Sequence, residues 1–154
     1  MKLKAIVFAL ALLLVSAVAA SADSPHLGTW KLNEAKSKIP KGATKNTTVV
    51  YEAAGDQIKV TVDGTDADGN AIHNEWTGKF DGKKYAVTGD PTQDMRSYRV
   101  VNSRTLSLRN TKGAKVVATG TVMLSRDGKT RTVTTRAVNA KGQWISTRAV
   151  YDKQ

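Results

Sequence analysis

The chain has 154 residues, a net charge of +11 and no cysteine. This length fits a single domain with one core, and the absence of cysteine excludes a disulfide framework, a lipoprotein anchor and a cysteine nucleophile. The basic residues are dispersed without a run of five or more, so we interpret most of them as solvated surface charge rather than as a nucleic-acid site. The alternative is an anionic partner such as lipid headgroups, lipopolysaccharide or an acidic small molecule.

The N-terminus has the three parts of a secretory signal peptide. Lys2 and Lys4 form a positive region, residues 5–15 form an apolar run too short to span a bilayer, and residues 20–22 supply the small side chains of a cleavage site. We therefore expect cleavage near Ala22, which removes residues 1–22 and leaves residues 23–154 as one exported domain, periplasmic or secreted.

The rest of the chain has the pattern of an antiparallel meander. Turn dipeptides such as Asp68-Gly69 and Asp127-Gly128 recur about every ten to fifteen residues, and the segments between them are rich in Val, Thr, Ile, Tyr and Trp. Only residues 33–44 have room for a helical turn, with Asn33 as its N-cap. The ten expected strands are residues 27–32, 46–54, 57–66, 71–80, 83–88, 95–101, 104–110, 115–125, 130–138 and 143–152.

Alternation of apolar and polar residues predicts that each strand buries one face. Ile58, Val60 and Val62 alternate with polar residues, as do Leu106 and Leu108. Ten sequential strands joined by hairpins favour closure into an up-and-down antiparallel barrel, because closure removes exposed strand edges. An outer-membrane barrel fits less well, since aromatic residues make up only 6% of the chain and form no girdle pattern.

Both ends of the expected domain carry a family resemblance. The segment at residues 28–32 (GTWKL) resembles the Gly-x-Trp first strand of the calycins, the superfamily of lipocalins and fatty-acid-binding proteins, and residues 147–153 (TRAVYDK) resemble the closing strand of the fatty-acid-binding proteins. The chain is also similar to small exported bacterial proteins with a lipocalin-like domain. The resemblance implies a barrel that holds a hydrophobic or amphipathic ligand, with Trp30 as a plug at one end of the core or as a wall of the cavity.

Two departures from the fatty-acid-binding proteins stand out. Their two-helix lid needs about twenty residues, whereas only about twelve separate the first two expected strands here, so the lid is reduced. Their closing strand also carries an Arg and a Tyr two residues apart, both pointing inward, whereas Arg148 and Tyr151 are three apart. Strand alternation places these two on opposite faces unless a bulge intervenes.

Arg136 and Arg148 lie on the last two expected strands, among apolar or Thr residues. They are candidates for an anion receptor inside the barrel, and the alternative is that both face solvent, since the sequence does not fix the register. The expected ligand-binding residues are Trp30, Ile58, Val60, Val62, Ile72, Trp76, Phe80, Leu106, Leu108, Arg136 and Arg148, with Val122 and Leu124 beside them.

We expect a binding protein rather than an enzyme. The chain has no Gly-x-Ser-x-Gly motif and no paired carboxylates with a reason to meet, and His26 and His73 lack companions that would hold a metal or cofactor. The leading hypothesis is an exported, monomeric protein that binds a fatty-acid-like molecule. The alternative is a periplasmic protease inhibitor that acts by inserting residues 23–26 into the active site of a protease.

Overall fold

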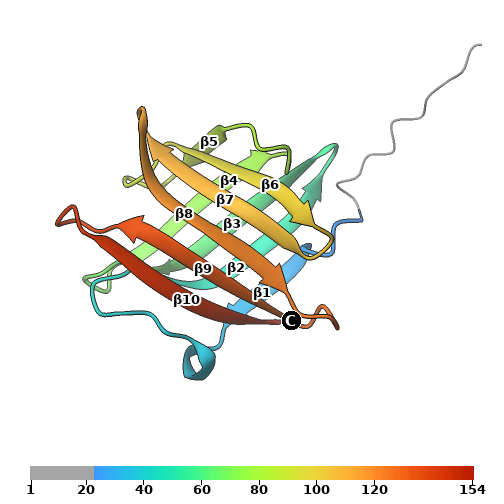
Figure 1. The fold of residues 1–154 in the computed structure, drawn as a ribbon, viewed down its shortest axis with the longest axis horizontal. Coiled ribbons are helices and arrows are strands. Elements are labelled where there is room, and N and C mark those ends of the chain that lie inside the picture. Colours follow the sequence, from blue (N-terminus) through green and yellow to red (C-terminus); the bar gives the residue numbers. More distant parts are fainter. Residues whose placement is uncertain (1–22) are drawn as a thin grey trace, which may run out of the picture.

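The computed structural model describes residues 23–154, and the expected signal peptide lies outside them. Ten antiparallel strands follow one another in sequence and close into a barrel (Figure 1). The predicted all-β, up-and-down barrel is therefore confirmed. The strands are β1 (Gly28–Leu32), β2 (Lys45–Ala54), β3 (Gln57–Thr65), β4 (Ala71–Gly78), β5 (Tyr85–Thr88), β6 (Met95–Asn102), β7 (Thr105–Lys112), β8 (Lys115–Leu124), β9 (Thr130–Val138) and β10 (Trp144–Lys153).

The connection between β1 and β2 holds the one helical element among the described residues, the 3-10 helix η1 (Glu34–Lys36). Asn33 caps it as predicted, because its Oδ1 accepts a hydrogen bond from the backbone N–H of Lys36 at 3.2 Å. The segment lies against β10, where Ser37 Oγ accepts the N–H of Val150 at 2.9 Å. The helical lid is thus reduced to a single turn.

Barrel closure depends on β1, which pairs with β10 on one side and β2 on the other. Gly28 begins β1 with a φ of +125°, and a Cβ at this position would lie 2.7 Å from the side chain of Lys153 on β10. A glycine therefore adopts this backbone conformation without strain and leaves room for the Lys153 side chain. This gives a physical reason for the Gly in the Gly-x-Trp segment.

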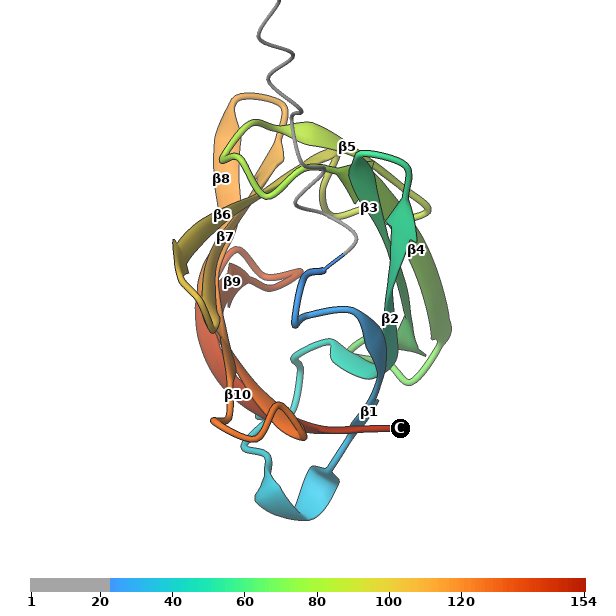
Figure 2. The same cartoon turned by 90° about the vertical axis from the view of Figure 1, so that its right-hand side faces the viewer.

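The core is concentrated at one end of the barrel, which we call the closed end. The N-terminal segment and the hairpins β2–β3, β6–β7 and β8–β9 meet there, and Figure 2 looks onto this end, with the start of β1 inside the ring of strands. Trp30 is fully buried at 0% exposure, and its Nε1 donates to the carbonyl of His26 at 3.0 Å. The interpretation of Trp30 as a core plug agrees with this position.

Replacement of Trp30 by Ala tests this role of the closed end. We expect the free energy of unfolding to fall by about 3–5 kcal/mol, since the change removes a fully buried aromatic side chain. Urea unfolding monitored by circular dichroism measures it. The matched control is Trp144→Ala, whose parent side chain is 44% exposed and should change stability by no more than about 0.5 kcal/mol. Equal losses in the two variants would contradict the plug role.

Candidate functional site

The size of the inward-facing side chains falls along the barrel from the closed end to the open end. The ladder row at the closed end pairs Leu124 with Arg131 and Arg131 with Tyr151. Nearer the open end, Leu108 pairs with Gly120, which pairs with Thr135. Large side chains therefore fill one half of the lumen, and small ones line the other.

A buried arginine organises the closed end. Arg131 is 2% exposed, and its guanidinium carbon lies 5.1, 4.7 and 4.9 Å from the ring centres of Trp30, Tyr51 and Tyr151. No carboxylate among the described residues forms an ion pair with it. Its Nε and Nη1 atoms are sealed from solvent without a hydrogen-bond partner. The three aromatic faces therefore provide the main stabilisation of this buried charge.

Tyr151 and Tyr98 remain neutral hydroxyl groups. Burial raises the pKa of Tyr151 to about 12, and burial also raises the pKa of Tyr98 well above its usual value. The Tyr151 hydroxyl donates to the carbonyl of Asn46 at 3.0 Å, and the hydroxyls of Tyr51 and Tyr98 lie 3.4 Å apart. These groups act as structural donors and acceptors.

The N-terminal segment folds back onto this end. The N–H of Leu27 donates to the carbonyl of Ser24 at 3.1 Å, and His26 is 2% exposed with its ring edge-on to Phe80. The interpretation of residues 23–26 as a projecting inhibitory segment gains no support, because the turn and the burial of His26 hold the segment against the core. His26 is instead part of the plug.

The open half of the lumen is accessible to solvent. Val133, Thr135 and Thr147 point inward by their register, yet all three are only half-buried. These positions lie toward the end of the barrel formed by the β1–β2 connection and the hairpins β3–β4, β7–β8 and β9–β10. The other half-buried inward residues on this side are Ile72, Leu108, Ala137 and Ile145.

A second buried arginine faces this open half. Arg96 is 5% exposed, and its Nη2 donates to Asn74 Oδ1 at 3.1 Å. Its other guanidinium N–H groups have no protein partner and, unlike those of Arg131, are not sealed from solvent. The ladder row that starts at Arg96 continues through Asn110, Ala118, Ala137 and Ile145. Two members of this row, Ala118 and Ala137, have only a methyl group as side chain. Arg96 is thus a cation with free donors beside a lumen lined by small residues.

Arg136 and Arg148 are not inside the barrel, which corrects the predicted anion receptor. Both are exposed on the outer face. The ladder between β9 and β10 runs without a bulge from Trp144 to Asp152, so Arg148 points outward and Tyr151 inward. Arg148 Nη1 donates to the carbonyl of Lys36 at 3.1 Å, and Arg136 lies 5.6 Å from the ring centre of Trp144.

The predicted apolar lining residues do lie on the inner face. The eight fully buried ones are Trp30, Ile58, Val60, Val62, Trp76, Leu106, Val122 and Leu124, and the half-buried ones are Ile72, Phe80 and Leu108. Most of these side chains pack against one another in the core. Only Ile72 and Leu108 border the accessible part of the lumen.

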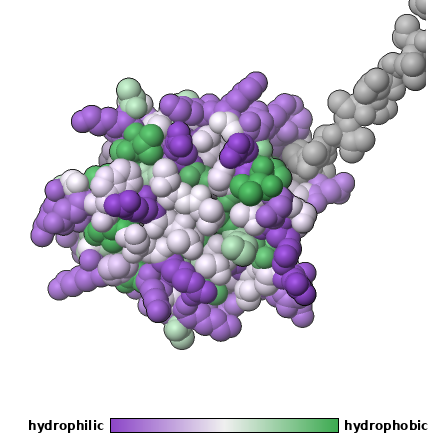
Figure 3. All heavy atoms as spheres, in the orientation of Figure 1, coloured by the Kyte–Doolittle hydropathy of each residue, from purple (hydrophilic) through white to green (hydrophobic). Residues whose placement is uncertain are grey.

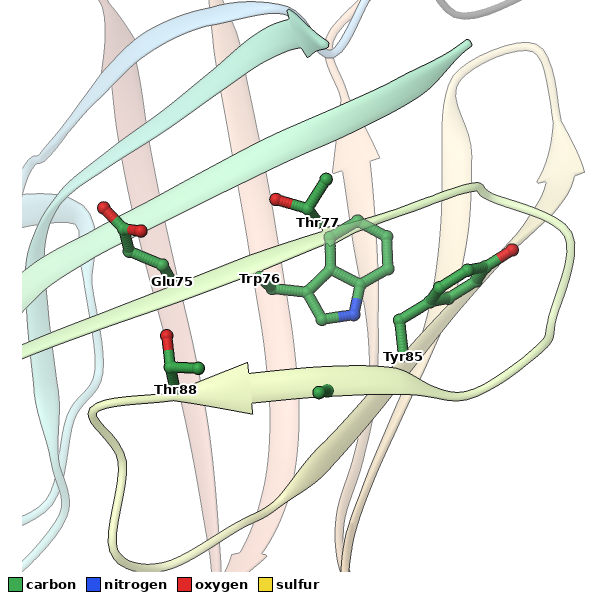
Figure 4. Close-up of a pocket in the computed structure, with 6 residues that line it drawn as sticks. Glu75, Trp76, Thr77, Tyr85 and Thr88 are labelled. Carbon is green, nitrogen blue, oxygen red and sulfur yellow. The ribbon is translucent and has the colours of Figure 1, made fainter. Parts of the chain in front are cut away.

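A separate cleft of about 270 Å³ lies between β4 and β5, where the ladder has only two residue pairs (Figure 4). Trp76 and Tyr85 lie in its wall with their rings edge-on at 5.7 Å, and Glu75, Thr77 and Thr88 surround it. A ligand pocket is typically about 300 Å³ or larger and mostly enclosed. The cleft is open to solvent, which makes it a weak candidate for a ligand site.

His73 lies on the outer face of β4 between two carboxylates, as expected for a solvated histidine. Its Nδ1 is 2.6 Å from Asp63 Oδ1 and its Nε2 is 3.7 Å from Glu75 Oε1, and the hydrogen bond with Asp63 raises its pKa. Across residues 23–154 there is no group of three or more His, Cys, Asp or Glu side chains that could hold a metal ion. In the same residues, no helix is long and apolar enough to span a membrane.

Comparison with known proteins leaves the family open. No protein-family model matches the chain, and no curated protein resembles it at a significant level. The site is therefore argued from its own geometry.

The alternation of inward and outward residues along a strand was the signal that could have located the two inward arginines. Arg131 shares its face of β9 with Val133 and Ala137, and Arg96 shares its face of β6 with Tyr98. The buried groups that the sequence did not single out as site residues include His26, Tyr51, Asn74, Arg96, Tyr98, Asn110, Arg131 and Tyr151.

The buried histidine predicts a pH dependence of stability. Burial, with the nearby charges of Arg131 and Lys153, lowers the pKa of His26 from 6.5 to about 4. A histidine whose pKa is lowered by folding stabilises the fold when neutral, so this stability is present above about pH 6.5 and is lost as the pH falls toward 4. We expect a loss of at most about 3 kcal/mol over this range.

The measurement is the free energy of unfolding across this pH range for the wild-type protein and for His26→Gln. The difference in the free energy of unfolding between the two proteins separates the contribution of His26 from that of the carboxylates, which titrate at lower pH. Parallel pH curves would show that folding does not lower the pKa of His26.

Proposed function

We propose that this protein is an exported, calycin-like barrel that binds a small amphipathic molecule with an acidic head group in the open half of its lumen. The observation that carries the proposal is Arg96, a buried guanidinium with unpartnered N–H groups, no carboxylate partner and access to solvent. Burying a cation without an anion is costly. A ligand carboxylate or phosphate would supply the missing partner and accept charge-assisted hydrogen bonds.

The surroundings of Arg96 fit such a ligand. Asn74 already accepts a hydrogen bond from one guanidinium nitrogen and fixes the plane of the group. Leu108 and Ile72 offer apolar contacts, while Ala137 and Gly120 leave room between them. Thr135 and Thr147 bond to each other through their hydroxyls at 2.7 Å, so each presents a methyl group as well. This lining suits a short apolar body better than a long acyl chain, because the closed end is occupied.

The calycin assignment is supported by three features. They are a closed ten-strand barrel, a Gly-x-Trp segment whose Trp30 plugs one end, and a chain whose last strand, β10, pairs with β1. The proposed export rests on residues 1–22 and is independent of the barrel.

Titration with a short-chain fluorescent fatty acid tests the ligand proposal. We expect saturable binding by the wild-type protein and a loss of about ten- to a hundredfold in affinity for Arg96→Gln, since a charge-assisted hydrogen bond is removed. The matched control is Arg136→Gln, which removes the same charge from the outer face and should bind as the wild type does.

A neutral analogue of the same ligand, such as the methyl ester, separates charge recognition from apolar contact. It should bind equally to the wild type and to Arg96→Gln. No saturable binding of any amphiphile up to its solubility limit would refute the proposed function. Equal affinity of acid and ester for the wild type would remove Arg96 as the receptor.

Mass spectrometry of the protein recovered from a Gram-negative host tests export. We expect a periplasmic or secreted protein whose first residue is Asp23, because cleavage after Ala22 follows the small-residue rule. An intact N-terminus in the cytoplasmic fraction would contradict it.

A further inference from the structure

The net positive charge of residues 23–154 is concentrated in one half of the barrel wall. Residues 95–153, which form β6–β10, contain 13 Lys and Arg but only two acidic residues, whereas residues 23–94 contain nine basic and eleven acidic residues. The charge therefore resides almost entirely on five adjacent strands. The sequence does not reveal this concentration of charge, because its arginines are far apart along the chain. They become neighbours only through the pairing of the strands.

Ion pairing increases the difference in unpaired charge between the two halves. Every ion pair among the described residues lies between Glu34 and Lys79. The two acids of the cationic half are occupied locally, since Asp127 accepts from Ser125 and from the N–H of Lys129, and Asp152 accepts from Asn33. The cations of β6–β10 are left without anionic partners.

The outer face of β6–β10 arranges these cations among hydroxyl groups. Arg109 pairs with Ser97 and Thr119, and Thr119 pairs with Arg136, which pairs with Ser146. The neighbouring row on this face contains Arg99, Ser107, Thr121, Thr134 and Arg148. All four arginines of these two rows are exposed.

The same half carries the exposed apolar side chains. Figure 3 views this side of the molecule and shows hydrophobic patches among the hydrophilic side chains around a pale centre. The large hydrophobic residues exposed among residues 23–154 are Val100, Val101, Val116, Met123 and Trp144, and all belong to β6, β8 or β10. Met123 and Trp144 point outward on the same face as the arginines.

We propose that the outer face of β6–β10 docks on the surface of an anionic phospholipid membrane. Guanidinium groups attract the headgroup phosphates, and hydroxyl groups between them can donate to phosphate oxygens. The exposed Trp144 and Met123 side chains of this face enter the headgroup region, which accepts apolar and amphipathic groups. This contact is peripheral and reversible.

The apolar residues favour a membrane over a soluble polyanion. Nucleic acid or an acidic polysaccharide would contact the arginines but would leave Met123 in water. A membrane interface takes up both kinds of side chain. Docking is separate from the ligand site, because Arg96 faces the lumen and the docking residues face outward.

Flotation with vesicles tests the proposal. We expect the protein to bind vesicles of phosphatidylcholine with phosphatidylglycerol, to ignore phosphatidylcholine alone, and to be released by high salt. The triple variant Arg109→Gln, Arg136→Gln and Arg148→Gln should bind about a hundredfold more weakly, at roughly fivefold for each cation near an anionic surface.

The matched control removes three exposed lysines from the other half, in the variant Lys41→Gln, Lys83→Gln and Lys84→Gln. Its net charge equals that of the arginine variant, so it should bind vesicles nearly as well as the wild type. Equal loss in both variants would show attraction by net charge alone and would overturn the assignment of this face.

Trp144 reports the orientation of the bound protein. Trp30 and Trp76 are buried at 0% and 1% exposure, so acrylamide quenching in the folded state arises mainly from Trp144. Anionic vesicles should protect it from the quencher. Binding without protection would overturn this orientation, and binding to DNA or heparin without binding to vesicles would replace the membrane by a soluble polyanion.

Discussion

The contact between a buried guanidinium and three aromatic rings is the constraint on which the closed end depends. Arg131 comes from β9, Tyr151 from β10, Tyr51 from β2 and Trp30 from β1. These strands surround the seam where the first and last strands of the barrel meet. A single cation therefore ties the two ends of the chain together, and a mispaired seam would leave that charge buried without its ring faces.

The filled end also determines where a ligand could lie. Because the rings, Arg131 and the folded N-terminal segment occupy one half of the lumen, only the other half can exchange contents with solvent. Arg96 lies near the boundary of these two halves, one inward position from Tyr98. The barrel thus separates a cation that is stabilised by aromatic rings and sealed from solvent from one whose free donors are not sealed.

The sequence predicted the strands well because each is bounded by strong turn residues and alternates cleanly. β9 begins and ends where residues 130–138 were expected, and Asn33 caps η1. Side-chain orientation was harder to predict. Arg136 and Arg148 have apolar or Thr neighbours on both sides, so composition alone does not assign their face. Arg96 and Arg131 share a face with buried apolar residues, but their charge conceals this because charged residues are usually exposed. The clustering of cations on β6–β10 could be recognised only from the cross-strand register that the structure gives.

The wall of the cylinder is held least firmly at β5. This four-residue strand has two residue pairs with β4 and two with β6, whereas β9 and β10 share nine. Local separation there would leave β4 and β6 as free edges able to pair with another chain, the usual start of aggregation. Lys83 and Lys84 flank this place in the loop before β5. Their repulsion between copies would act as a solubility device at the point where the barrel is easiest to open.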